Sequence, residues 1–121
     1  RSRSSNRLML SRKFRFHSRG GVRSTYQNGK TIRDPKISLV FAVNTRKKQR
    51  FAVVVSKKVL KSAVGRNRIR RRVYEAIRLE HSRIEQPYDC IFVIYNKEIL
   101  KMPFKELRSL ISSLLKEANI I

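Results

Sequence analysis

The sequence is poor in acidic residues and in cysteine, and it has no tryptophan and no long apolar run. Only 8 Asp and Glu residues accompany 30 Lys and Arg residues among 121, so the formal net charge is +22. No apolar run reaches the roughly 18 residues that a membrane-spanning helix needs, and no long basic amphipathic helix with bulky aromatics suggests a membrane surface. Nucleic acid is therefore the leading partner, because so large a positive excess opposes a compact state until an anion binds.

Residues suited to catalysis by the protein itself are also scarce. The single cysteine, Cys90, lies in the apolar run YDCIFVIY, which predicts a buried core residue in a reducing, cytoplasmic compartment and excludes a disulfide. His17 and His81 have no partners at metal-ligand spacing, and no glycine-rich phosphate loop is present. Glu75 and Glu80 lie among arginines on one expected helix, where we interpret them as ion-pair partners. The pattern predicts a binding protein without catalytic residues or a metal site of its own.

The length predicts one domain with a modest core. Residues 1–13 are expected to form a basic N-terminal arm, and residues 14–121 the folded domain. The Arg- and Ser-rich beginning could also be a transit peptide, although it lacks an amphipathic repeat. Met9 reads as a natural start, which would make residues 1–8 an upstream extension.

Apolar periodicity predicts the order helix, strand, strand, helix, strand, helix. Val22 and Tyr26, spaced i and i+4, indicate a short first helix that ends in the left-handed conformation at Asn28-Gly29, although the same pair could turn a hairpin. The remaining elements are expected in KISLVFAV (36–43), FAVVVS (51–56), the segment from Arg66 to Pro87, YDCIFVIY (88–95) and the final helix after Pro103.

The two early strands are expected to pair as a hairpin, since the basic turn NTRKKQR joins them. FAVVVS is a nearly continuous β-branched run, which is typical of a central strand. A helix between two strands predicts a mixed sheet with packed helices, an α+β fold whose crossover would ordinarily be right-handed.

The stretch GRNRIRRRVYEAIR has five arginines between Arg66 and Arg72. On a helix, one stripe of polar positions would face away from the apolar stripe of Ile69, Val73 and Ile77. That polar stripe comprises Asn67, Arg71, Tyr74 and Arg78, with Arg68 and Arg72 beside it. Guanidinium groups stay charged and bind phosphate oxygens in pairs, so the stripe indicates a surface for a polyanion.

A solvated charge run or a localisation signal is the alternative for this stretch taken alone. The preceding segment SKKVLKSAVG favours an RNA surface, because Lys57, Lys58 and Lys61 converge where the strand leads into the helix. Five arginines at the start of one helix also repel one another, and a phosphate backbone relieves that repulsion.

The ordered run SKKVLKSAVGRNRIRRRVYEAIR (56–78) resembles the signature of the bacterial ribonuclease P protein subunit: a strand ending in Ser-Lys-Lys, a loop with Ala-Val, and then Arg-Asn-Arg-Ile-basic-Arg. A weaker resemblance covers nearly the whole chain. It implies an α/β sandwich of the class named after domain 2 of ribosomal protein S5, with a left-handed crossover into the arginine helix. It also implies the non-catalytic subunit of an endoribonuclease whose catalytic RNA, with divalent metal such as Mg²⁺ held mainly by that RNA, removes the 5′ leader of precursor tRNA.

The resemblance implies two RNA-facing surfaces on one protein per RNA. The residues matched to the surface for the catalytic RNA are Lys57, Lys58, Arg66, Asn67, Arg68, Arg70 and Arg71, and the neighbouring Lys61 and Arg72 are added to them. A cleft between the first helix and the sheet would receive the single-stranded leader, with Val22, Tyr26 and either Val40 or Phe41. Tyr74 replaces a frequent arginine, and Val22 a common phenylalanine. A small ribosomal protein and a self-sufficient nuclease remain the alternative classes.

Overall fold

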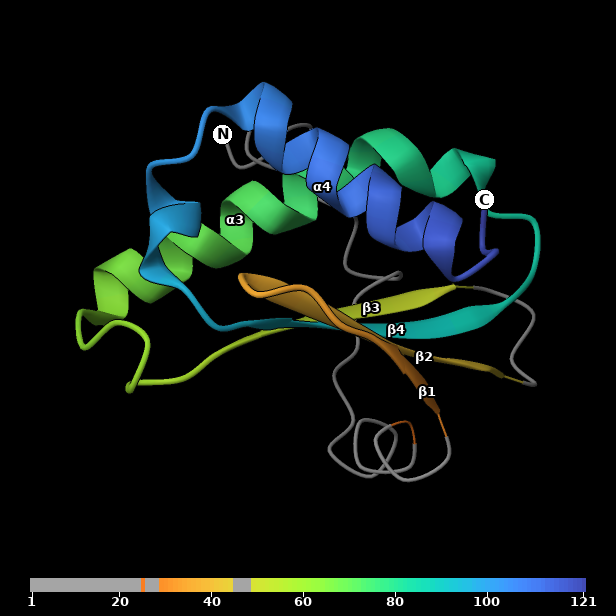
Figure 1. Ribbon diagram of the computed structural model, residues 1–121, viewed down its shortest axis with the longest axis horizontal. Coiled ribbons are helices and arrows are strands. Elements are labelled where there is room, and N and C mark those ends of the chain that lie inside the picture. The colour runs from red at the N-terminus through yellow and green to blue at the C-terminus, as the bar shows by residue number, and fades with distance from the viewer. Residues whose placement is uncertain (1–24, 26–28, 45–48) are drawn as a thin grey trace, which may run out of the picture.

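The computed structural model describes residue 25 and residues 29–44 and 49–121. The expected arm at 1–13, Met9, and the helix positions Val22 and Tyr26 lie outside these residues. Within the described part, two long helices pack together on one face of a four-stranded sheet (Figure 1). The expected α+β fold with a mixed sheet and packed helices is confirmed.

The sheet has the spatial order β1 (Lys30–Ile32), β2 (Ile37–Val43), β4 (Tyr88–Ile94) and β3 (Arg50–Val55). β2 pairs antiparallel with both β1 and β4, whereas β3 pairs parallel with β4. The predicted hairpin of β2 and β3 is therefore wrong, because β4 lies between them. β1 was not predicted at all, since three residues are too few to show an alternating pattern.

Burial on both faces explains why β4 is central. Cys90 and Phe92 on one face and Ile91 on the other are all 0% exposed. β3 lies at the edge of the sheet, where Val54 is 36% exposed, although its β-branched run predicted a central position. β-branched composition thus reports that a strand forms, whereas its place in the sheet depends on which strands cover it.

The helix α3 (Ala63–Glu80) connects the parallel strands β3 and β4, as a crossover between parallel neighbours requires. The Ser62 hydroxyl caps its first turn by accepting a hydrogen bond from the Gly65 amide at 3.1 Å. The predicted apolar stripe is confirmed, because Ile69, Val73 and Ile77 are fully buried against the sheet. This β3–α3–β4 unit is the crossover for which the resemblance predicts the left-handed sense.

The chain then passes through two short 3-10 turns, η2 (His81–Arg83) and η3 (Lys97–Leu100), on either side of β4. The final helix α4 (Phe104–Glu117) buries Leu107, Ile111 and Leu114 beside α3. The main core thus lies between the sheet and the two helices, and a smaller cluster of Val40, Ala52 and Ile91 lies on the opposite face of the sheet.

Gly29 is needed for space rather than for a left-handed turn. Its amide donates a hydrogen bond to the Thr25 carbonyl at 2.8 Å, and no described glycine has a positive φ. The left-handed turn is expected at Asn28-Gly29; Asn28 lies outside the described residues, and Gly29 itself has no positive φ. A Cβ atom at this position would lie 2.5 Å from the Thr25 carbonyl oxygen and 2.6 Å from that of Phe41. Only glycine allows the backbone before β1 to approach β2 so closely.

Candidate nucleic-acid interface

The basic loop 56–62 is built from a tight turn that leaves its lysines in solvent. The amides of Val59 and Leu60 donate to the Ser56 carbonyl at 3.1 and 3.4 Å, and both side chains pack partly against the main core. Lys57, Lys58 and Lys61 are exposed. The apolar pair anchors the loop, so the three ammonium groups are presented on its outer side.

Arg66 holds this loop against the first turn of α3. Its Nη1 donates hydrogen bonds to the carbonyl oxygens of Leu60 at 2.9 Å and Lys61 at 2.7 Å. Gly65 lies against the same loop, since a Cβ there would be 2.5 Å from Cδ2 of Leu60. Arg66 thus fixes where the loop lysines lie relative to the helix, in addition to carrying its own charge.

The outer side of α3 presents Asn67, Arg68 and Arg71, all exposed. Arg70 lies on the same turn and donates from Nη1 to the Asn67 side-chain oxygen at 2.7 Å. Arg68 and Arg71 make no ion pair or hydrogen bond with the described residues. We define the basic face as the loop 56–62 together with these four residues and Arg66.

No acidic residue occurs between positions 35 and 74, so the basic face has no carboxylate of its own segment to neutralise it. The first turn of α3 also contains no acid. Ion pairs begin only in the second half of the helix, where Glu75 binds Arg78 at 2.6 Å and Glu80 binds Arg83 at 2.9 Å. The uncompensated positive charge of α3 itself is therefore concentrated in its N-terminal half.

Arg72 faces inward and stabilises the fold. Its guanidinium donates to the main-chain carbonyls of Ile99 at 2.6 Å, Leu100 at 2.7 Å and Met102, at the end of η3. Burial lowers the pKa of this guanidinium below its ordinary value. Three donors committed to one turn tie α3 to the start of α4, so the structure separates Arg72 from the exposed arginines of the basic face.

Tyr74 is also interior. The prediction that it shares the exposed stripe of α3 is wrong, since its side chain is 9% exposed and belongs to the main core. Arg78 ends the stripe in an ion pair with Glu75, whose hydrogen bonds raise the pKa of the Arg78 guanidinium. The exposed stripe is thus shorter than the sequence predicts and ends near Arg71.

Glu80 joins the two helices. Its carboxylate is nearly buried and accepts hydrogen bonds from Arg83 at 2.9 Å and from Nε of Arg108 on α4 at 2.8 Å. Burial alone would raise the pKa of this carboxyl, but the two arginines outweigh it and hold the pKa below its ordinary range. The contact with Arg108 was not predicted, because the two residues are 28 positions apart.

The two candidate cleft residues on β2 lie on opposite faces of the sheet. We refer to the face without α3 and α4 as the second face. Phe41 lies on the side of the helices, where its ring meets Tyr88 edge-on with centroids 6.1 Å apart. Val40 lies on the opposite face with Ala52 and Ile91. Of the two register choices, Val40 is the one that belongs to the face without α3 and α4.

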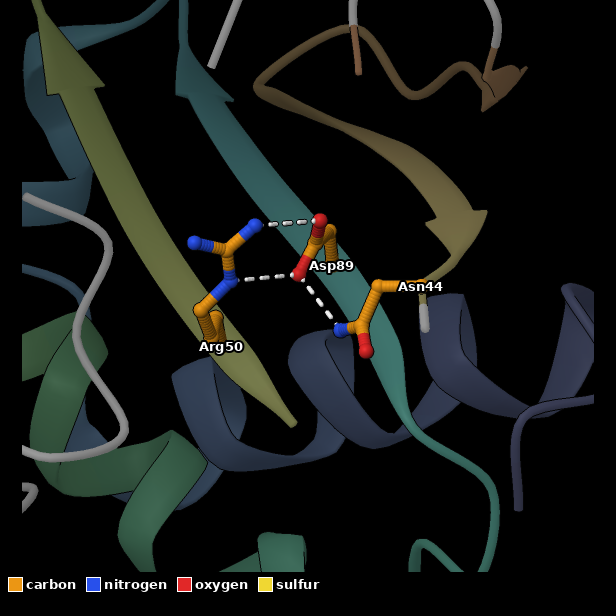
Figure 2. Close-up of polar contacts among 3 residues, drawn as sticks. All are labelled: Asn44, Arg50 and Asp89. Carbon is orange, nitrogen blue, oxygen red and sulfur yellow. Dashed lines mark hydrogen bonds and ion pairs between the residues drawn. The ribbon is translucent and has the colours of Figure 1, made fainter. Parts of the chain in front are cut away.

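A buried ion pair closes one end of this second face. Figure 2 shows the Asp89 carboxylate between the side chains of Arg50 and Asn44. Arg50 donates from Nε and Nη2 at 2.9 and 2.8 Å, and the Asn44 amide donates at 2.7 Å. One carboxylate therefore connects β3 and β4 with the residue that follows β2.

No three His, Cys, Asp or Glu side chains in residues 25, 29–44 and 49–121 come together as a set that could hold a metal ion. In the same part of the chain, no helix is both long and apolar enough to cross a membrane.

Comparison with known proteins gives one consistent family. The sequence model of the family Ribonuclease P matches residues 10–119. The ribonuclease P protein component of Chloroflexus aurantiacus is 37% identical over 112 residues, which cover 93% of this chain and 82% of that protein. That of Caldanaerobacter subterraneus is 38% identical over 95 residues, covering 78% and 80%.

Two solved structures share the fold. The RNase P protein of Staphylococcus aureus superposes with a TM-score of 0.77 at 22% identity, over 88% of this chain and 96% of that one. The protein from Thermotoga maritima gives 0.76 at 24% identity, over 85% and 96%.

Proposed function

This chain belongs to the ribonuclease P family as the protein component of that RNA-containing endoribonuclease, and we propose that its basic face binds the catalytic RNA. The enzyme is the ribonucleoprotein that processes the 5′ ends of tRNA, and an RNA partner follows from the family. The observation that carries our assignment of the RNA surface is the run of 40 positions, 35 to 74, without a carboxylate.

The basic face suits phosphate for three reasons. Arg68 and Arg71 are exposed and make no contact with a described acid, so their donors are available to an anion. Arg66 fixes the lysine loop beside them, so less conformational entropy is lost when RNA binds. Each phosphate that the face neutralises releases condensed counterions, which adds a salt-dependent contribution to affinity.

We assign the precursor tRNA leader to the second face of the sheet. Val40, Ala52 and Ile91 form a small buried apolar cluster beneath this face, and the Arg50–Asp89 pair lies at one end of it. Val22 and Tyr26 remain proposed members of this cleft on the resemblance alone. An aromatic ring at position 26 would stack on a leader base, a contact worth roughly 1–3 kcal/mol.

The chemistry is assigned to the RNA. The described carboxylates do not converge into a ligand set, and Asp89 and Glu80 already bind arginines. Divalent metal ions held mainly by the RNA would activate the attacking water. In this proposal one protein binds one catalytic RNA in the bacterial cytoplasm and contributes RNA binding and leader binding.

The test is reconstitution at low magnesium. The protein is added to the cognate catalytic RNA, and cleavage of leader-bearing precursor tRNA is compared with binding of mature tRNA. We expect faster leader removal and a preference for leader-bearing substrate. No gain in cleavage would reject the function, whereas cleavage by rigorously RNA-free protein would show a self-sufficient nuclease instead. A Tyr26→Ala variant should lose more with leader-bearing substrate than with mature tRNA, and equal losses would reject the cleft.

A further inference from the structure

The charges of α4 are separated around the helix. Glu106 lines a small hollow with Asp34 and Met102, and Glu117 lines a different groove beside Tyr88. The basic residues of α4 line a third groove, of about 440 Å³. Its lining comprises Lys105, Arg108 and Lys116, the hydroxyl residues Ser109, Ser112 and Ser113, and Glu80 from α3. We refer to this surface as the α4 groove.

The one acid in the α4 groove is already neutralised. Glu80 is 3% exposed and accepts hydrogen bonds from both Arg83 and Arg108. Lys105 and Lys116 are exposed and form no ion pair with the described residues. The groove therefore presents two available ammonium groups and three hydroxyls in a row. Ammonium and hydroxyl groups are the donors that commonly contact phosphate oxygens of nucleic acids.

The α4 groove is separate from the basic face. Glu80 follows Arg68 by 12 positions on α3, a distance of about 18 Å at the rise of an α-helix. The α3 residues of the basic face and the α4 groove both belong to the helical layer, whereas the cluster of Val40, Ala52 and Ile91 lies on the other face of the sheet (Figure 1). A large RNA that binds α3 can therefore reach α4 from the same side. A leader bound to the opposite face of the sheet does not contact α4 at the same time.

We propose that the α4 groove binds the phosphate backbone of a second segment of the catalytic RNA. The proposal rests on the proposed function, because the same RNA must first occupy the basic face. Lys105 and Lys116 supply the charge, and the serine hydroxyls between them supply uncharged donors. The two contacts, one on the N-terminal half of α3 and the other on α4, would fix the orientation of the protein on the RNA, which a single basic patch cannot do.

The first test removes the two available charges. The variant Lys105→Ala/Lys116→Ala is compared with Lys30→Ala/Lys97→Ala, which loses the same net charge outside the groove. Affinity for the catalytic RNA is measured over a range of salt concentrations, without precursor tRNA. We expect the slope of log K against log salt to become shallower by about 1.4–1.8 for the groove variant, since each lost phosphate contact reduces its magnitude by about 0.7–0.9. Equal slopes for both variants would overturn the proposal.

A third variant separates this failure from failure of the proposed function. Arg68→Ala/Arg71→Ala alters the basic face only. If this variant loses affinity while the groove variant behaves like its control, the α4 groove is rejected and the basic face is retained. If neither loses affinity, the proposed function fails as well.

The second test locates the RNA segment. Cys90 is buried, so a cysteine introduced at Ser109 or Asn67 is the reactive thiol to which an iron chelate can be attached. We expect radical cleavage of the catalytic RNA at one segment from position 109 and at a different one from position 67. If the chelate at position 109 cleaved only precursor tRNA, or cleaved no RNA at all, the assignment would be overturned.

Discussion

Arg50 on β3 and Asp89 on β4 occupy paired positions of two parallel strands and are joined by hydrogen bonds of 2.9 and 2.8 Å. Their side chains are 12% and 9% exposed, so both charges are largely removed from water. Burial makes each charge costly without the other. The pair therefore ties the stability of the β3–β4 register to a single contact at one end of the proposed leader surface (Figure 2).

Removing one partner of this pair should destabilise the protein strongly. We expect Asp89→Ala to lower the free energy of unfolding by about 3–5 kcal/mol, because it removes the carboxylate that accepts hydrogen bonds from Nε and Nη2 of the buried Arg50. Urea denaturation gives this value. The matched control is Arg50→Met/Asp89→Leu, which removes both charges and should recover most of the loss. A single variant as stable as the wild type would show that water reaches the pair.

The sequence predicts the strands of the core better than their order. Alternation in KISLVFAV and apolar continuity in YDCIFVIY indicate strands from local pattern alone. Pairing depends on contacts between distant segments, and proximity along the chain favoured a hairpin that does not form. The clearest local indication of strand order is in β4, where apolar residues occupy both faces of the strand. Such a strand is most stable between two neighbours, whereas β3 exposes Val54.

The arginine cluster was found from the sequence, but the separate roles of its members were not. Arg66 and Arg72 both bind carbonyl oxygens, and the partners of Arg72 come from 27 to 30 residues later in the chain. Helical periodicity cannot place such partners. Tyr74 could have been interpreted as interior, because it directly follows Val73 and precedes Ile77 by three positions, beside the apolar stripe.

Arg68 and Arg72 should respond differently to alanine. Arg68→Ala is expected to leave stability within about 0.5 kcal/mol of wild type, because the side chain is exposed. The slope of log K against log salt for RNA binding should become shallower by about 0.7–0.9, because one phosphate contact is lost. Arg72→Ala should lose about 1–3 kcal/mol of stability, since it leaves carbonyls of the η3 turn without their donor. Salt titrations and urea denaturation measure the two effects.

An unchanged salt slope for Arg68→Ala would exclude Arg68 as a phosphate contact. A shallower salt slope of RNA binding for Arg72→Ala, with stability unchanged, would show that Arg72 contacts the RNA.

Glu80 should make stability depend on pH in the acidic range. Its pKa in the folded protein lies below the ordinary value of 4.5, so its stabilising effect is present above that value and is lost as the pH falls through the folded pKa. Glu80→Gln is expected to cost about 1–3 kcal/mol at neutral pH, because hydrogen bonds to a charged group are replaced. Urea denaturation from about pH 7 to about pH 3 measures the difference between the two proteins.

The difference between wild type and Glu80→Gln should shrink at the acidic end of that series. The exposed Glu117→Gln is the control and should show little difference at any pH. A Glu80 difference that stays constant down to the lowest pH would mean that its ionisation is not coupled to folding.

Gly29 and Gly65 both lie close to a neighbouring group, but the two neighbours differ in how easily they can move. A Cβ at Gly29 would be 2.5 Å from the Thr25 carbonyl oxygen and 2.6 Å from that of Phe41, whose backbone is paired in the sheet and cannot move aside easily. Gly29→Ala is therefore expected to cost about 1–3 kcal/mol. A Cβ at Gly65 would meet the side-chain end of Leu60, which can rotate, and alanine gains about 1 kcal/mol of helix propensity. Gly65→Ala should thus be nearly neutral in urea denaturation, and an equal loss for both variants would show that the Leu60 anchor of the basic loop is as rigid as the sheet.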